Sequence, residues 1–153
     1  MKKVIINADD FGYSKIFNEE ILKLAKNKKI TGISVMVDYF KDNTTSIQYE
    51  EIKKYKDILG LHVDFENINL NEISFEDEII RQYNLFIDTF DIHPHFLDMH
   101  KYLHKIKGQE SIEKFCNSKN IYYRNLTGKK NKLTTSEEKI TGSFLDFNKI
   151  KIK

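Results

Sequence analysis

The sequence is poor in the residues that build disulfide frameworks, flexible linkers and membrane spans. Its 153 residues include one cysteine, Cys116, one proline and six glycines. The single cysteine excludes an internal disulfide and fits a reducing compartment. No apolar run approaches the roughly 20 residues of a membrane-spanning helix, and the start MKKVIINADD lacks the apolar region of a signal peptide. We therefore expect a cytoplasmic protein without a membrane partner.

The charge balance and the length point to an ordinary globular domain. The formal net charge is +2, which is too small to favour a nucleic-acid partner. Hydrophobic residues make up 40% of the chain and charged residues 31%, a composition typical of folded proteins. No internal repeat, low-complexity tract or Pro/Gly-rich linker divides the sequence. We expect one domain over residues 1–153.

Strand-like and helix-like segments alternate along the first 124 residues. The predicted strands are 3–8, 31–39, 59–65, 95–100 and 121–124. The predicted helices follow Ser14 and cover 43–58, 74–90 and 109–120, with Ser14 and Ser74 as N-caps and with Phe17 and Ile80 on apolar stripes. Four strand–helix units and a fifth strand predict an α/β fold, a parallel sheet or barrel with helices outside.

The pattern fades from Leu126 onward, where the chain becomes polar and rich in lysine. Two interpretations stay open for this tail. One is a solvated, partly disordered end. The other is a cover for an exposed sheet edge, formed by the segment ITGSFLDF at 140–147.

Acidic and imidazole side chains follow three of the predicted strands. In VIINADDFGYS, an apolar run leads directly into Asp9 and Asp10. His62 and Asp64 end the third strand, and Asp98 and His100 end the fourth, with His104 one helical turn beyond. The carboxyl ends of parallel strands meet at one edge, where active sites of such folds gather. We therefore expect these side chains to share one rim.

Two adjacent acids repel each other, so burying them requires a positive charge between or beside them. No basic residue follows Asp10 until Lys15, which makes a divalent metal the simpler hypothesis. One carboxylate and two imidazoles would leave positions open for water and substrate, as in catalytic metal sites. The second carboxylate could then accept a proton from metal-bound water.

Taken singly, each of these residues has a plain structural interpretation. An aspartate after a strand is usually a helix cap, and a lone His62 is more often a half-buried histidine than a ligand. His93 and His95 flank Pro94 and suit a surface turn. His100 and His104 form a metal pair only if both lie on one helix, and Cys116 suits a core position. Only the combination favours a metal.

Three motifs resemble the ordered motifs of the YdjC-like carbohydrate deacetylases, also called the ChbG family. They are NADDFGYS, GLHVDF and PHFLDMHKYLH, and the resemblance covers about residues 3–124. The first motif is nearly complete and specific, whereas the second is short. In the third, Met99 replaces the usual serine and Tyr102 stands where the family often has histidine, while His104 matches the last histidine.

The resemblance implies a distorted or incomplete (β/α) barrel of the TIM type. It also implies a metal-dependent hydrolase of carbohydrate metabolism that removes acetyl groups from N-acetylated sugars, typically chitin-type oligosaccharides. Asp10, His62 and His100 would be the metal ligands. Asp9 would be the general base, Asp98 the partner of a ligand histidine, and Arg124 a contact of the base or the substrate. The metal would be Mg²⁺ or Zn²⁺ first, with manganese, iron and cobalt also compatible.

The departures from the family leave further alternatives open. The last barrel strands and a further histidine motif, often the source of the general acid, have no counterpart after His104. The chain is then either an active deacetylase in which His104 is the general acid, or a degenerate relative. Such a relative would keep a metal-binding or sugar-binding site without catalysing the reaction. A different metal hydrolase, such as a phosphoesterase, is a weaker third hypothesis. An open barrel would favour a homodimer.

The aromatic residues near the predicted rim also have two interpretations. Phe11, Tyr13, Phe65 and Tyr102 could stack on a pyranose ring, or they could pack in the core.

Overall fold

Five parallel strands form one sheet, in the order β1-β2-β3-β4-β5. The computed structural model describes residues 5–66, 68–69, 72–101 and 105–124. The strands are β1 (Asn7–Phe11), β2 (Gly32–Val35), β3 (Leu59–Val63), β4 (Phe96–Met99) and β5 (Tyr122–Tyr123). Each strand pairs with the next one along the chain, with helices in between. The predicted α/β fold with parallel strands is confirmed, and the open sheet fits an incomplete barrel.

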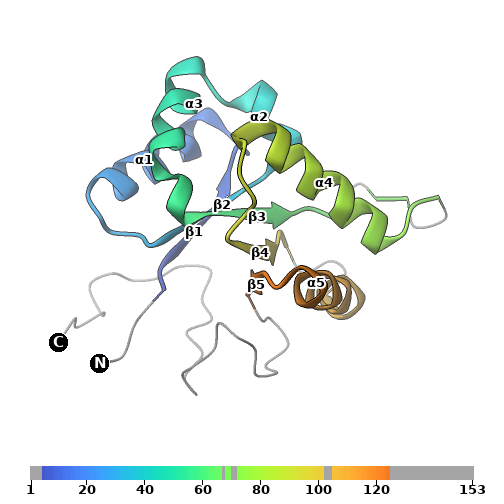
Figure 1. Ribbon diagram of the computed structural model, residues 1–153. Helices are drawn as coiled ribbons and strands as arrows, with labels where there is room; N and C mark the ends of the chain where they lie inside the picture. The colour runs from blue at the N-terminus through green and yellow to red at the C-terminus, as the bar shows by residue number, and fades with distance from the viewer. Residues whose placement is uncertain (1–4, 67, 70–71, 102–104, 125–153) are drawn as a thin grey trace, which may run out of the picture.

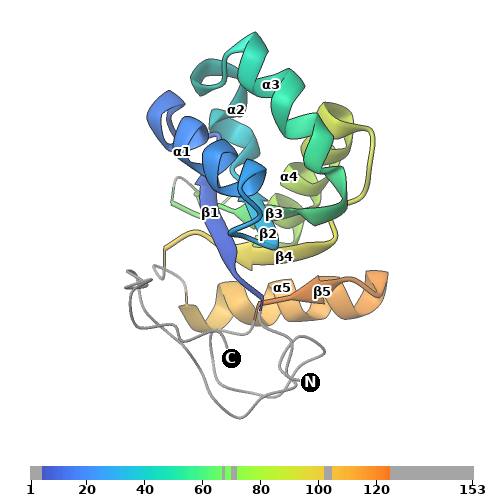
Figure 2. The ribbon, with the colours of Figure 1, turned by 90° about the vertical axis from the view of Figure 1, so that its left-hand side faces the viewer.

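Helices cover one side of this sheet. They are α1 (Lys15–Lys26), α2 (Val37–Asn43), α3 (Ser46–Ile52), the 3₁₀ helix η1 (Lys53–Ile58), α4 (Phe75–Phe90) and α5 (Lys105–Lys119). Figures 1 and 2 both show α1 to α4 on the same side of the strands, and α5 packs against α4, β4 and β5. The predicted caps are confirmed, because the hydroxyls of Ser14 and Ser74 accept hydrogen bonds from Phe17 N and Asp77 N.

The two faces of the sheet differ in polarity because successive strand residues point to opposite sides. Alternate residues such as Ile33, Leu61 and Leu97 are fully buried in the core beneath the helices. Burying one such side chain contributes about 1.5–3 kcal/mol. Ser34, His62 and Asp98 occupy the intervening positions and therefore lie on the other face. The sheet thus separates an apolar core from a second face that carries buried polar side chains.

The structure corrects several predicted boundaries. β1 covers Asn7–Phe11 rather than 3–8, so Asp9 and Asp10 lie inside the strand. β2 ends at Val35, and Val37–Asn43 forms α2 although its first residues are strand-like. Val37 is buried in this helix, so tertiary packing outweighs its β propensity.

The prediction of a single helix over 43–58 is also wrong. It is divided into α3 and η1, and α3 begins with a capping box between Thr45 and Gln48. The Thr-x-x-Gln spacing is a signal for that start. α5 starts at Lys105 rather than at Gln109. Two residues of the predicted apolar stripes, Phe17 and Ile80, are 48% and 45% exposed.

Other expectations about single residues agree with the structure. Cys116 is fully buried, and this burial raises the pKa of its thiol to about 12. His93 and His95 are exposed before β4. The predicted tail, including 140–147, lies outside the described residues. In the part of the chain that the structure describes, no helix combines the length and apolar character needed to cross a membrane.

Candidate metal centre

The backbone of β1 departs from regular strand geometry at Asp10. Its φ angle is 69°, and the register with β2 shifts between Ala8 and Phe11. In a regular strand, Asp9 and Asp10 would point to opposite faces of the sheet. Aspartate tolerates this left-handed conformation better than most residues. The irregularity lets both carboxylates reach the polar side of the sheet.

Asp10 lies beside two imidazoles that come from β3 and from the end of β4. Its Oδ1 is 3.0 Å from Nε2 of His62 and 2.9 Å from Nδ1 of His100. His62 lies on β3, and His100 directly follows β4. The ligand-type atoms of the three residues all lie within 4.8 Å of one another. The structure therefore brings together Asp10, His62 and His100, which we name the candidate metal group.

Asp98 fixes the orientation of His62. Its carboxylate is fully buried and hydrogen-bonds to Nδ1 of His62, which leaves Nε2 directed at Asp10. A carboxylate behind a ligand histidine is a common arrangement at protein metal sites. Burial raises the pKa of Asp98, but the charges of Arg124 and His62 outweigh it and hold that pKa below its usual range.

The same contacts determine the protonation of the candidate metal group. Burial lowers the pKa of His62, yet the charge of Asp98 and the hydrogen bonds that His62 donates to the carboxylates of Asp10 and Asp98 raise it to about 10. Burial raises the pKa of Asp10, but hydrogen bonds with His100 and His62 bring it well below its usual range. These contacts favour the protonated form of His62, and a metal bound by its Nε2 would take the place of that proton.

Asp9 has a different set of partners. Arg124 binds it with two hydrogen bonds, of 3.0 and 2.9 Å, and also lies 3.1 Å from Asp98. The Asn7 amide donates to Asp9 at 2.7 Å and the Ser34 hydroxyl donates at 3.2 Å. Paired donors of this kind hold a carboxylate in one orientation. The two adjacent aspartates are therefore compensated separately, Asp10 by imidazoles and Asp9 by an arginine.

Asn7 and Ser34 were not predicted as site residues. Asn7 belongs to the NADDFG motif and lies two positions before Asp9, on the same face of β1. Ser34 is the only hydroxyl residue of β2 and is fully buried. Two signals in the sequence could have identified them. Asn7 is two positions from Asp9, and Ser34 is a hydroxyl residue inside an otherwise apolar strand.

The donor set fits a divalent metal. One carboxylate and two imidazoles are common ligands of first-row metals, and nitrogen donors favour zinc, manganese, iron or cobalt over magnesium. Ligand atoms on such a metal lie about 3–3.5 Å apart, close to the distances within the candidate metal group. Nε2 of His100 is buried without a hydrogen-bond partner among the described residues. These residues could therefore accept a metal with little rearrangement.

A second group of potential ligands adjoins the first. Asp64, Glu66 and His100 also place ligand-type atoms within 4.8 Å of one another. However, the ammonium of Lys101 lies 2.9 Å from both carboxylate oxygens of Glu66. The Asp64 carboxylate accepts hydrogen bonds from the Tyr39 hydroxyl and from Glu66 N. A lysine already supplies positive charge here, so we assign no metal to this group.

The remaining predicted residues have mixed outcomes. Phe11 and Phe65 are buried in the core, which favours packing over sugar stacking for both. Tyr13 is 40% exposed, and its ring centre lies 6.0 Å from that of His100. His104, the candidate acid, and Tyr102 lie outside the described residues.

Comparison with known families and structures supports the resemblance. The model of the family "YdjC-like protein" matches residues 3–69, which confirms the resemblance over this part of the chain. The matched segment includes Asp9, Asp10 and His62, and it ends before His100 and Arg124. Comparison with curated proteins gave no match.

Solved structures share the fold at low sequence identity. A protein from Enterococcus faecalis, named as a candidate for cellobiose-phosphate cleavage, is 19% identical with a TM-score of 0.58; the match covers 81% of this chain and 59% of that one. A CE4 family pseudoenzyme from Bacillus anthracis is 10% identical with a TM-score of 0.53, covering 80% of this chain and 42% of that one. A mutant of that pseudoenzyme with restored enzymatic activity is 12% identical, with a TM-score of 0.52 and coverage of 80% and 43%. The chain thus spans 59% of the length of the first of these proteins and less than half the length of the other two.

Proposed function

We propose that this chain is a divalent-metal-dependent hydrolase that removes acetyl groups from N-acetylated sugars or chitin-type oligosaccharides. The main supporting observation is the convergence of Asp10, His62 and His100 next to an aspartate held by an arginine. The resemblance to the YdjC-like family supports the carbohydrate substrate. Residues 1–153 would act as one domain. The predicted cytoplasmic location and homodimer stay predictions.

The residues have separate roles in this reaction. Asp10, His62 and His100 would hold the metal, and Asp98 would keep His62 in the required orientation. When bound, the metal would polarise the acetyl carbonyl and make water more acidic. Asp9 would accept the proton of the attacking water. Arg124, Asn7 and Ser34 would hold the Asp9 carboxylate in position.

The leaving amine also needs a proton, and this step separates the two versions of the proposal. Among the described histidines, only His62 and His100 lie at the rim, and both belong to the candidate metal group. The predicted acid His104 lies outside the described residues. A degenerate relative that binds metal or sugar without turnover is therefore the second candidate. The CE4 pseudoenzyme and its reactivated mutant show that one fold can carry either state.

The test is the metal content of the purified chain and of matched variants. Asp10→Asn keeps the side-chain size and tolerates the left-handed backbone, so it removes mainly the charge of the ligand. We expect about one metal equivalent in the wild type, and none in Asp10→Asn or in a His62→Ala, His100→Ala variant. Asp9→Asn should keep the metal but lose roughly 10²–10⁴-fold in deacetylation of N-acetylated oligosaccharides.

The outcomes separate the hypotheses. Metal without deacetylation in the wild type would favour the degenerate relative. No metal after incubation with zinc, manganese or magnesium would contradict the proposal. If Asp9→Asn lost the metal and Asp10→Asn kept it, Asp9 would be the metal ligand and Asp10 the general base.

A further inference from the structure

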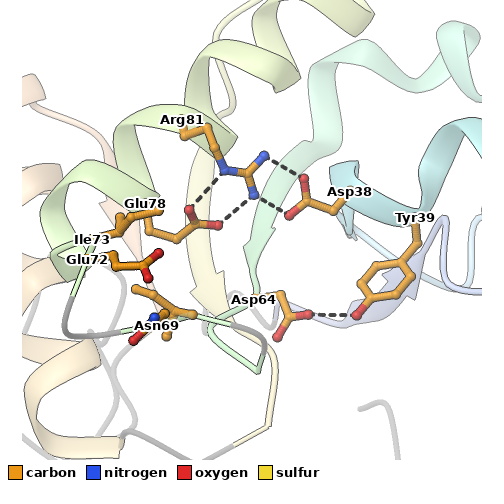
Figure 3. A pocket seen from close by; sticks show the side chains of 9 residues that line it. Asp38, Tyr39, Asp64, Asn69, Glu72, Ile73, Glu78 and Arg81 are labelled. Atoms are coloured by element: carbon orange, nitrogen blue, oxygen red, sulfur yellow. Dashed lines mark hydrogen bonds and ion pairs between the residues drawn. The ribbon is translucent and has the colours of Figure 1, made fainter.

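A pocket of about 460 Å³ lies beside the candidate metal group. Figure 3 shows the side chains that line it. It opens between α2, the end of β3 and the start of α4. Its volume is within the usual range for small-molecule sites. The lining residues are Asp38, Tyr39, Asp64, Ile68, Asn69, Glu72, Ile73, Glu78 and Arg81. We name this feature the acidic pocket.

The acidic pocket adjoins the candidate metal group at Asp64. Asp64 lines the pocket and also lies within 4.8 Å of His100, measured between their ligand-type atoms. The Tyr39 hydroxyl donates a 3.1 Å hydrogen bond to Asp64. The Tyr39 ring lies 5.6 Å from that of Tyr13, which in turn lies beside His100. The pocket is therefore within reach of a sugar unit next to one held at the candidate metal group.

The charges of the pocket are unbalanced. Arg81 forms paired hydrogen bonds to Asp38, of 2.8 and 2.6 Å, and to Glu78, of 2.9 and 2.6 Å (Figure 3). The one guanidinium is therefore already matched by two carboxylates. Asp64, whose charge interacts with that of Lys101, and Glu72 add two more carboxylates. None of the residues drawn in Figure 3 pairs with Glu72. The lining thus favours a ligand with positive charge.

The other walls suit a sugar ring. Tyr39 offers part of an aromatic ring, and Ile68 and Ile73 offer apolar surface. Asn69 provides an amide next to them. An apolar wall combined with a few polar groups is the usual composition of a small-molecule site, and it matches a pyranose, which has C–H faces and hydroxyl edges. A bare metal ion would make no use of these walls.

We propose that the acidic pocket binds the sugar unit next to the one that is deacetylated, and that it selects a unit with a free, protonated amine. This inference rests on the proposed function and specifies its substrate as a partly deacetylated amino-sugar oligosaccharide. An N-acetylated unit is neutral at the same position, whereas a 2-amino sugar carries a positive charge. The carboxylates of the pocket distinguish the two through that charge.

Binding of single sugars to the full chain tests the proposal without requiring hydrolysis. Glucosamine and N-acetylglucosamine are titrated into the protein, and amide chemical shifts of Tyr39, Asp64 and Ile73 are followed by NMR. We expect the titration of these signals to give a lower Kd for glucosamine than for N-acetylglucosamine. High salt should raise the Kd of glucosamine. Glu72→Gln should weaken glucosamine binding roughly two- to fivefold, as expected for an exposed charge pair. Glu110→Gln, the same change at an exposed position on α5, is the matched control and should have no effect.

Three outcomes would overturn the proposal. One is equal binding of the two sugars with no effect of Glu72→Gln. Another is no shift of the pocket signals by either sugar. A third is a shift of these signals by Mg²⁺ that persists in the His62→Ala, His100→Ala variant, with no response to glucosamine, which would make the pocket a cation site. None of these results depends on deacetylation, so the proposed function would fail only in its own metal and activity measurements.

Discussion

Asp9 and Asp10 are neighbours in the chain, yet they contact different partners. The left-handed backbone at Asp10 turns its carboxylate toward His62 and His100. Asp9 keeps the regular strand direction and meets Arg124 instead. Strained backbone of this kind costs about 1–3 kcal/mol and persists where the surroundings enforce it. Hydrogen bonds with two buried imidazoles provide such surroundings for Asp10.

Arg124 offers a prediction at the scale of one residue. Its guanidinium forms two parallel bonds to Asp9, which a lysine ammonium cannot reproduce. Arg124→Lys should keep the positive charge and the metal content but lower the deacetylation rate at least about tenfold, because Asp9 is held less precisely. Steady-state kinetics and elemental analysis of the same preparation measure both. An unchanged rate would show that the orientation of Asp9 does not depend on Arg124.

The turn between β1 and α1 illustrates how elements are fixed to one another. Gly12 has a φ of 100°, and its amide donates a 2.7 Å hydrogen bond to the side chain of Asn18. Asn18 is fully buried and donates to Asn43 O and to the Thr44 hydroxyl. The turn is thereby linked to α1 and to the end of α2. This linkage holds the strand end that carries both aspartates.

Gly12 gives a prediction at the scale of an element. A Cβ at this position would lie 2.8 Å from Met36 O, and the positive φ is unfavourable for alanine. Gly12→Ala should lower the free energy of unfolding by about 1–3 kcal/mol, measured by urea denaturation.

The control is Lys28→Gly at the end of α1. Lys28 is exposed and has a φ of 54°, so glycine should be neutral there or stabilise the protein by up to about 1 kcal/mol. Equal stability of Gly12→Ala and the wild type would mean that the turn adapts to a side chain.

At the scale of the whole molecule, the candidate metal group joins three strands. Asp10 lies on β1, His62 on β3, and His100 directly follows β4. These residues are far apart in the sequence, so the site exists only in the folded chain. A ligand that binds only the folded state stabilises it by mass action, by about 2.7 kcal/mol at a free concentration of 100 Kd.

Metal binding should therefore raise the melting temperature. For a chain of this length we expect an increase of roughly 5–10 °C at saturating metal, and its loss after treatment with a chelator. Differential scanning calorimetry with and without metal measures it. The His62→Ala, His100→Ala variant is the control and should show no increase. An equal increase in that variant would place the bound metal elsewhere.

The sequence by itself determined the alternation of strands and helices and the residue types at the strand ends. These features are local, because hydrophobic periodicity and capping residues act within a few positions. Asp10, His62 and His100 were predicted together from their motifs, and they do lie together. The start of α3 after Thr45 could also have been predicted from the sequence, because a capping box involves only residues three positions apart.

Tertiary structure alone decided how these residues are paired. From the residues alone, a metal between or beside Asp9 and Asp10 was the simpler hypothesis, and only the family resemblance named Arg124 as a contact of the base or the substrate. In the structure Arg124, 115 positions away, binds Asp9. The left-handed backbone at Asp10 and the contacts of Ser34 depend on which strands are neighbours. The acidic pocket likewise combines residues of α2, of α4 and of the segment between β3 and α4. Such pairings follow from the register and curvature of the sheet, which bring distant residues together and which no local pattern encodes.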